Sequence, residues 1–210
     1  RSGMAVMDMI AKGINARDFM TVKSFQNALT VDMALGCSTN TALHLPAIAH
    51  DAGIELSLKL INDVSDKTPH LVSLRPAGVY HVEDLDTAGG VQAVIKELSE
   101  KNLIHDELIT ATGKTIKENL KNVVNLDPEV IRPIGNPYHP IGGLAALFGN
   151  IAPEGSIVKQ SAVSDKMQKH SGPAKVFESE DSAVAAMKAG KIVKGDVVVI
   201  RYEGPKGGPG

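Results

Sequence analysis

The pattern of apolar and polar positions predicts that the first part of the chain is mainly helical. Stretches of mixed or mainly apolar residues indicate helices over 4–12, 21–35, 42–52, 57–65, 91–101 and 116–123. Thr21 is suited to cap the second of these helices, and Gly53 to end the third in a left-handed conformation. Pro46 lies inside the third helix, where it removes one backbone hydrogen bond and should bend the axis.

Start signals support two of these helices. Gly89 and Gly90 open the fifth, and Thr115 with Glu118 three residues later gives the capping-box pattern at the start of the sixth. A short apolar run predicts one strand over 71–74. Helices that alternate with short strands are typical of a layered α/β unit.

The second part of the chain is predicted to be rich in strands. The segment 132–143, RPIGNPYHPIGG, holds three prolines and three glycines, so it is the best candidate for a boundary. After it, apolar runs predict strands over 144–148, 156–163, 174–177 and 197–202. One helix is expected from Asp181 to Ala189, with Ser179 as its cap and Gly190 as its end.

Composition narrows the possible partners and the possible compartment. Hydrophobic residues make up 43% of the 210 residues, which is enough for a packed core, but aromatic residues only 3%. The formal net charge of −2 gives no electrostatic reason to expect a nucleic acid or a membrane as partner. No run of about 20 apolar residues predicts a membrane span. The single cysteine excludes an internal disulfide and fits a reducing cytosol.

Glu203 is the first candidate for chemistry. It follows a strongly apolar strand and Arg201-Tyr202, and it precedes the loop GPKGGPG at 204–210. A carboxylate at a strand end can bind Mg²⁺, act as a base, or pair with Arg201 or Lys206, and spacing alone leaves these alternatives open. The loop matches neither a Walker motif nor the dinucleotide-binding fingerprint.

The small residues GCSTNT at 36–41 are the second candidate. Hydroxyl and amide side chains at a helix N-terminus offer an anion site for a carboxylate or a phosphate, whereas ordinary capping by Ser38 or Thr39 is the simpler explanation. Cys37 within this stretch could be a soft ligand or a nucleophile, although a lone thiol is more often a small buried hydrophobe.

The histidines give no clear metal site. His44 and His50 are six residues apart and therefore lie on different helix faces. His81 precedes Glu83 and Asp84, which could bind a hard cation but fit better as the acidic first turn of a helix.

Three long stretches together resemble one enzyme family. They are MALGCSTNTALHLPAIAHDAGI at 33–54, PIGNPYHPIGGLAALFGNIAPEGSIVK at 133–159 and SGPAKVFESEDSAVAAMKAGKIVKGDVVVIRYEGPKGGPG at 171–210. In order and spacing the chain resembles the dehydratase family that contains dihydroxy-acid, 6-phosphogluconate and sugar-acid dehydratases. The resemblance covers essentially the whole chain but well under half of a complete family member, so we expect a piece of a longer polypeptide that is inactive by itself.

The resemblance implies an iron–sulfur, Mg²⁺-dependent hydro-lyase. Members of the dihydroxy-acid branch convert 2,3-dihydroxy-3-methyl carboxylic acids to 2-keto acids in valine, isoleucine and, through the valine precursor, leucine synthesis. The C2 proton and the 3-hydroxyl leave as water, and the enol then becomes the ketone. The resemblance implies a cluster iron as Lewis acid on the departing hydroxyl, and Mg²⁺ to hold the substrate oxygens.

The resemblance also assigns residues. Glu203 matches the Mg²⁺-binding glutamate, and the presence of Glu rather than Gln there favours the dihydroxy-acid branch. Ser38, Thr39 and Asn40 match a motif that we expect to line the active site. Cys37 replaces a residue that is commonly Gly in the family, so we do not expect it to be a cluster ligand. The cluster ligands and the other Mg²⁺ ligands are expected before residue 1, and the serine base after residue 210.

For the fold, the resemblance implies that residues 1–135 are the end of a layered α/β/α N-terminal domain. Residues 136–210 would be the first part of a β-rich, swivelling β/β/α, barrel-like C-terminal domain. A small dihydroxy-acid substrate, a homodimer and a cytoplasmic location are implied as well.

Two other functions remain open. A sugar-acid or 6-phosphogluconate dehydratase would share the chemistry and differ in its substrate pocket. A non-catalytic module that binds a carboxylate through Ser38–Asn40 would belong to a different functional class.

Overall fold

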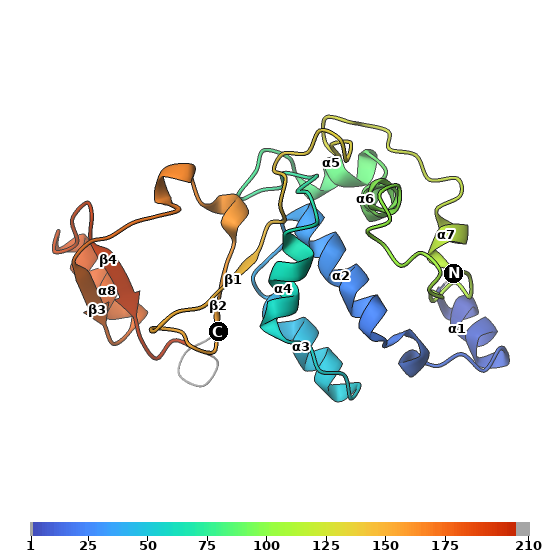
Figure 1. Cartoon of the computed structure of the whole chain (residues 1–210), viewed down its shortest axis with the longest axis horizontal. Helices are drawn as coiled ribbons and strands as arrows, with labels where there is room; N and C mark the ends of the chain where they lie inside the picture. Colours follow the sequence, from blue (N-terminus) through green and yellow to red (C-terminus); the bar gives the residue numbers. More distant parts are fainter. Residues whose placement is uncertain (1, 205–210) are drawn as a thin grey trace. The chain divides into compact units, whose positions relative to one another are not determined.

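A computed structural model describes residues 2–204 and shows a mixed helix-and-strand structure (Figure 1). The chain divides into two compact units, a first unit of Arg1–Val163 and a second unit of Ser164–Gly210. This division lies after the predicted boundary at 135/136, because the strand at 145–147 packs on a helix of the first unit and pairs with the strand at 156–158. The assignment of 1–135 and 136–210 to two evolutionary domains stays a prediction. Residues 205–210, most of the predicted glycine loop, lie outside the described residues.

The first unit is built mainly from helices. Its helices are α1 (Ser2–Ala11), the 3₁₀ turn η1 (Ala16–Phe19), α2 (Val22–Leu35), α3 (Thr41–Asp51), α4 (Leu58–Ser65), α5 (Val82–Thr87), α6 (Gly90–Ser99), α7 (Ile116–Asn119) and the 3₁₀ turn η2 (Gln160–Ala162). The predicted helices are therefore confirmed. Thr21 caps α2 by accepting a hydrogen bond from the Ser24 N–H, and Gly53 has the expected positive φ of 76°.

Helix α2 is the centre of the first unit. It packs against α3, α4 and α6, and Figure 1 shows α2 and α4 side by side. Two apolar clusters flank it. One gathers Ala34, Leu35, Leu71, Val72, Leu85, Ala88, Ala93, Val94, Leu98, Ile104, Val130 and Ile131. The other gathers Leu29, Met33, Ile61, Leu144 and Ala146. Burial of these aliphatic side chains supplies most of the driving force that holds α2 in place.

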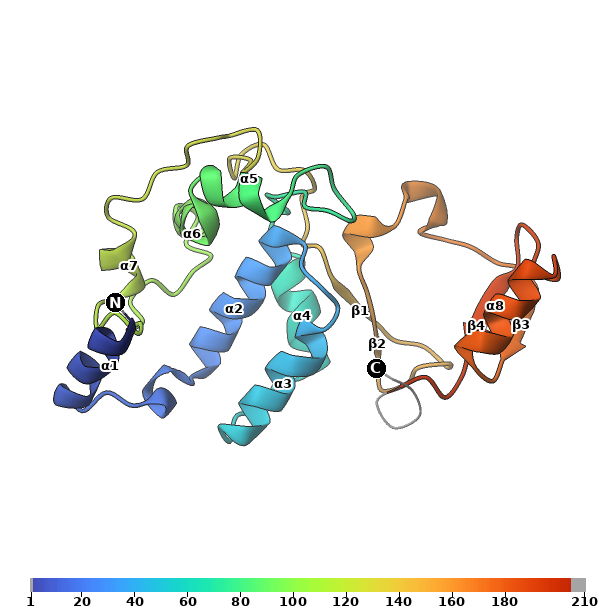
Figure 2. The same ribbon diagram turned by 180° about the vertical axis from the view of Figure 1, so that it is seen from behind.

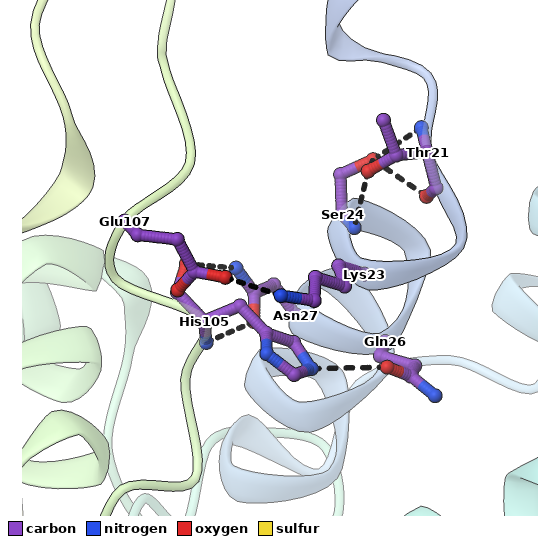
Figure 3. A network of polar contacts seen from close by, with 7 residues as sticks. All are labelled: Thr21, Lys23, Ser24, Gln26, Asn27, His105 and Glu107. Carbon is purple, nitrogen blue, oxygen red and sulfur yellow. Dashed lines mark hydrogen bonds and ion pairs between the residues drawn. The ribbon is translucent and has the colours of Figure 1, made fainter.

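Polar contacts attach the loop after α6 to the first half of α2 (Figure 3). The buried Asn27 amide donates to the His105 carbonyl over 3.1 Å and accepts from the His105 N–H over 2.8 Å. Gln26 contacts the His105 ring, and Lys23 forms an ion pair with Glu107 over 2.6 Å. The Asn27 side chain thus pairs with both backbone polar groups of His105, as a residue of a neighbouring strand would.

A two-stranded antiparallel hairpin ends the first unit. Strand β1 (Ala145–Leu147) pairs with β2 (Ser156–Val158), with Ala146 opposite Ile157. The hairpin packs on α4, where Asn62 donates to the Ala146 carbonyl over 2.9 Å and accepts from the Ala146 N–H over 2.8 Å.

The predicted strand over 71–74 is wrong. His70, Val72 and Leu74 form only isolated bridges to three different segments, around residues 139, 131 and 80. The N–H groups of Leu71 and Val72 both donate to the Ala34 carbonyl at the end of α2. Because its hydrogen bonds are divided among several partners, this extended segment joins no regular ladder.

Several other elements are shorter than predicted, and β1 and β4 differ from the prediction by only one or two residues at an end. Helix α7 ends at Asn119 rather than 123, and β2 ends at Val158 rather than 163. After β2 the Gln160 amide donates to the carbonyls of Gly142 and Leu144, over 2.7 and 3.2 Å, and the chain turns into η2. These side-chain contacts replace the strand ladder.

The second unit contains one strand–helix–strand motif. Strand β3 (Ala174–Phe177) pairs in parallel with β4 (Val197–Ile200), with α8 (Glu180–Lys188) between them in sequence and the 3₁₀ turn η3 (Asp165–Met167) before them. Figure 2 shows α8 lying against the two strands, which Ala183 and Ala186 allow by their small size. Ser179 caps α8 and Gly190 has a φ of 69°, as predicted.

Candidate functional site

Residues 37–41, Cys-Ser-Thr-Asn-Thr, lead from the end of α2 into the first residue of α3 and are here called the 37–41 turn. Gly36 ends α2 in the left-handed conformation, with φ 60° and ψ 48°. The N–H groups of Gly36 and Cys37 both donate to the Asp32 carbonyl, and the Thr41 N–H donates to the Ser38 carbonyl. Sequence therefore dictates the turn locally, since only glycine takes this backbone conformation without strain.

Side chains at the top of the turn face solvent, and two backbone donors there are free. Ser38, Thr39 and Asn40 are exposed, and the Ser38 hydroxyl accepts from the Asn40 N–H over 3.2 Å. Within residues 2–204, the N–H groups of Ser38 and Thr39 make no hydrogen bond. The N-cap of α3 is Asn40, and it makes no side-chain capping bond, so the predicted capping by Ser38 or Thr39 is wrong. The Ser38 contact with the Asn40 N–H is a local turn that precedes the helix.

Asp32 lies beneath the turn and is a functional candidate that the sequence analysis missed. It is only 6% exposed, and its Oδ1 accepts from the Thr41 hydroxyl over 2.7 Å. Its Oδ2 is buried without a hydrogen-bond partner in the described part of the chain. Burial raises the pKa of this carboxyl, while the hydrogen bond from Thr41, the neighbouring Cys37 thiol and the charge of Lys159 oppose the rise.

Cys37 does not fit an iron–sulfur ligand. Burial, together with the neighbouring Asp32 charge, raises the pKa of its thiol to about 12. A cluster ligand must be a thiolate, and the chain has no second cysteine. Cys37 is half-buried, and its exclusion from the cluster ligands stays a prediction.

A tightly packed histidine supports the turn from below. His70 is 5% exposed and stacks on His139, with ring centroids 5.4 Å apart and planes within 10°. A Cβ at Gly36 would overlap the His70 ring, and a Cβ at Gly143 would lie 2.5 Å from the Gly36 Cα. Burial, with the charges of His139 and Lys159, lowers the pKa of His70 to about 4. His70 is therefore neutral at physiological pH.

Glu203 lies in the second unit, at the N-terminus of α8. Its half-buried carboxylate accepts from the Glu180 N–H over 2.8 Å. Tyr202 has a φ of 63°, unusual for a residue with a side chain, and this turn follows the end of β4. The strained residue before Glu203 and the helix end together fix the carboxylate.

Arg201 does not neutralise Glu203. Its guanidinium pairs with Glu178, with Nη2 2.7 Å from Oε1, and lies over the Tyr202 ring. This contact raises the pKa of Arg201 and leaves Glu203 without a positively charged partner among the described residues. One Glu203 oxygen accepts from Glu180, and the other has no hydrogen-bond partner among residues 2–204, which fits a single carboxylate ligand of Mg²⁺; Lys206, the other partner considered for it, lies outside the described residues.

Other sequence candidates remain ordinary structural residues. His44 and His50 lie on α3, and His81 precedes the acidic first turn of α5, where Asp84 accepts from the His81 N–H. Residues 2–204 contain no group of three or more His, Cys, Asp or Glu side chains that could hold a metal ion. In that same range, no helix is both long and apolar enough to cross a bilayer.

Comparison with known proteins identifies the family. Residues 1–119 match the family model described as dihydroxy-acid/6-phosphogluconate dehydratase N-terminal, and residues 129–210 match the corresponding C-terminal model. The chain therefore belongs to the dihydroxy-acid/6-phosphogluconate dehydratase family.

Several curated relatives are similar over the whole chain. A dihydroxy-acid dehydratase of Agathobacter rectalis is 62% identical over 209 residues, which cover 100% of this chain and 37% of the relative. Proteins of the same name from Desulfatibacillum aliphaticivorans and Acetivibrio thermocellus are 62% and 59% identical over 210 residues, or 38% of each relative. The chain thus spans less than two fifths of the length of these relatives.

Proposed function

We propose that this chain forms part of a hydro-lyase that converts 2,3-dihydroxy-3-methyl carboxylic acids to 2-keto acids in valine, isoleucine and leucine synthesis. The observation that carries the proposal is identity of about 60% to dihydroxy-acid dehydratases over the entire chain. This similarity includes both candidate regions, the 37–41 turn and Glu203. The proposal extends to the whole protein what the relatives' names say of them.

In this proposal Glu203 is one ligand of Mg²⁺. Its support is the available carboxylate oxygen, the absence of a positively charged partner within residues 2–204, and the backbone contact that fixes the side chain. Mg²⁺ bound there would supply Lewis-acid stabilisation for the oxygens of the substrate. Glu203 itself acts by holding a fixed negative charge at the end of β4.

The 37–41 turn is proposed to orient the substrate. The free N–H groups of Ser38 and Thr39, together with their exposed hydroxyls, form hydrogen-bond donors suited to a carboxylate or a hydroxyl. The aliphatic residues of α3 that follow suit a small branched substrate better than a phosphorylated sugar acid.

The described residues do not fit an iron–sulfur cluster, because Cys37 is the only cysteine and its thiol is protonated. We therefore propose that the cluster ligands lie outside these 210 residues and assign no step to a cluster here. The serine base is placed outside them as well, as the family resemblance implies. The layered α/β/α and swivelling barrel-like architecture, the homodimer and the cytoplasmic location belong to this proposal too.

A second candidate is a 6-phosphogluconate or sugar-acid dehydratase. The description of the matching family models supports this alternative, because it names 6-phosphogluconate dehydratase beside dihydroxy-acid dehydratase. A carboxylate-binding module without catalysis is the outcome that remains if no dehydration occurs.

The decisive experiment replaces the matching segment of the Agathobacter rectalis relative with this chain, which is 62% identical to it. The chimera is purified without oxygen, supplied with Mg²⁺, and offered 2,3-dihydroxy-3-methylbutanoate or 6-phosphogluconate. We expect 2-keto acid from the first substrate only. Turnover of the second alone would change the substrate, and turnover of neither by a chimera with intact iron and sulfide would contradict the proposal.

A Glu203→Gln variant of the chimera tests the metal role. Gln keeps an oxygen for the Glu180 N–H but removes the charge, so kcat/KM should fall at least about a hundredfold, or about 2.7 kcal/mol. Asp181→Asn is the matched control, because it removes a charge from the first turn of the neighbouring helix α8 and leaves both the Glu203 contact with Glu180 and the Arg201–Glu178 pair in place. Retained activity in the Glu203→Gln variant would refute the assignment.

A further inference from the structure

We infer that Asp32 is the positioning residue of the 37–41 turn, and that it acts through the Thr41 hydroxyl. The inference rests on the proposed function, since it concerns how the turn is held for the substrate. Asp32 is remote from solvent and does not itself meet the substrate. No sequence motif pointed to it.

The backbone of Asp32 fixes the beginning of the turn. Its carbonyl accepts from the N–H of Gly36 and from the N–H of Cys37, the latter over 3.3 Å. A single carbonyl thus closes the last turn of α2 and sets the direction in which the chain leaves the helix.

The side chain of Asp32 fixes the end of the same turn. Its Oδ1 accepts from the Thr41 hydroxyl over 2.7 Å, and Thr41 is the first residue of α3. One residue therefore holds both sides of the exposed Ser38–Asn40 segment. The two free N–H groups lie between these anchors, so their direction depends on both contacts.

The packing of this region does not by itself explain why a polar acceptor, rather than an apolar side chain, is buried at position 32. A buried charge is costly unless hydrogen bonds satisfy it, yet Oδ2 has no partner within the described residues. An apolar side chain would pack here without that penalty. The costly arrangement is explained if the short bond to Thr41 is needed to fix the turn.

The test compares variants at both ends of the Asp32–Thr41 contact in the chimera. Thr41→Val removes the hydroxyl at nearly constant size, whereas Thr41→Ser keeps it. Thr41→Val and Asp32→Ala should raise KM for 2,3-dihydroxy-3-methylbutanoate at least about tenfold and change kcat less, as expected for lost ground-state orientation. Thr41→Ser and Asp32→Asn should stay within about threefold, because each retains the donor or the acceptor.

Thr30→Val is the control for loss of a hydroxyl on α2. The Thr30 hydroxyl donates to the Gln26 carbonyl of its own helix and does not touch the turn. Its KM should therefore be unchanged. If Thr30→Val raises KM as much as Thr41→Val, the effect reports general loosening of α2 and the inference is wrong.

Amide exchange separates this inference from the proposed function. In the chain itself, the N–H groups of Thr41 and Ala42, which donate to Ser38 and Thr39, should exchange at least about tenfold faster in Thr41→Val, with α6 unchanged. An inactive chimera together with this exchange result would refute the proposed function but leave the role of Asp32 in holding the 37–41 turn supported. Unchanged exchange, or faster exchange with unchanged KM in an active chimera, overturns the positioning role.

Discussion

The two candidate regions are supported in different ways. The 37–41 turn stands on a buried base, where Gly36, Gly143 and the His70 ring lie too close together to admit another methyl group. Glu203 stands on a small unit in which Val176, Val198 and Ile200 are each more than 40% exposed. The first region is held by tertiary packing, and the second by a helix end and one strand pair. Interlocked packing makes a site accurate but sensitive to substitution, because the interior cannot yield locally.

The largest expected difference concerns Gly36 and Gly190, two of the glycines that end helices. Gly36→Ala places a methyl group against the His70 ring at a positive φ, so we expect a loss of about 4 kcal/mol in unfolding free energy. Gly190→Ala has the same backbone strain but no atom within 4 Å of the new Cβ, so about 1 kcal/mol is expected. Urea unfolding of both variants measures the difference. Equal losses would show that the base of the turn is not interlocked.

His70 provides the second test, through pH. Its folded pKa of about 4 lies below the ordinary value of 6.5, so the unfolded chain binds the proton more readily between these values. The stability that this histidine contributes is complete above pH 6.5 and is lost as pH falls toward 4, by about 2 kcal/mol between pH 7 and pH 5.

The measurement is a series of urea unfolding curves over this pH range, for the chain and for His70→Gln. The variant should show a flatter pH dependence. His81→Gln is the control, because His81 is exposed and its replacement should leave the slope unchanged. An unaltered slope in His70→Gln would show that the buried ring does not set the acid sensitivity of the first unit.

The smallest effects should be equal in the two units. Thr21 caps α2 in the first unit and Ser179 caps α8 in the second, and each side chain accepts from a backbone N–H three residues later. Replacement of either by Ala should cost about 1 kcal/mol, measured as the change in native-state amide exchange of its own helix. A much larger loss of stability in one unit would show that the two regions differ in local helix capping rather than in packing.

Much of the local structure could be predicted because its causes are local. Gly53 and Gly190 ended helices as expected, and Thr21, Ser179 and the pair Thr115–Glu118 started them. The prediction of a strand over 71–74 was wrong. Its apolar residues suit a strand, but its hydrogen bonds go to α2 and to three separate segments. A strand depends on a partner that the local sequence does not specify.

The candidate site could be predicted only in part. Glu203 and Ser38–Asn40 were found through a motif, and the structure shows available hydrogen-bonding groups at both. Asp32 was not found, because an acidic residue in a helix usually faces solvent and nothing in its neighbours signals burial. The pairing of Arg201 with Glu178 rather than with Glu203 was also open until the two strand ends were placed together.

The parallel pairing of β3 with β4 has a consequence for the order of folding. Parallel neighbours cannot be joined by a tight turn, so all of α8 and its flanking residues must be traversed before Ala174 meets Val197. Helix α8 can form from local contacts, while the strand pair must wait for loop closure. The carboxylate of Glu203 reaches the start of α8 only after that closure. The contact between Glu203 and the Glu180 N–H should therefore form late in the folding of the second unit. Pulse-labelled amide exchange would show when the Glu180 N–H becomes protected.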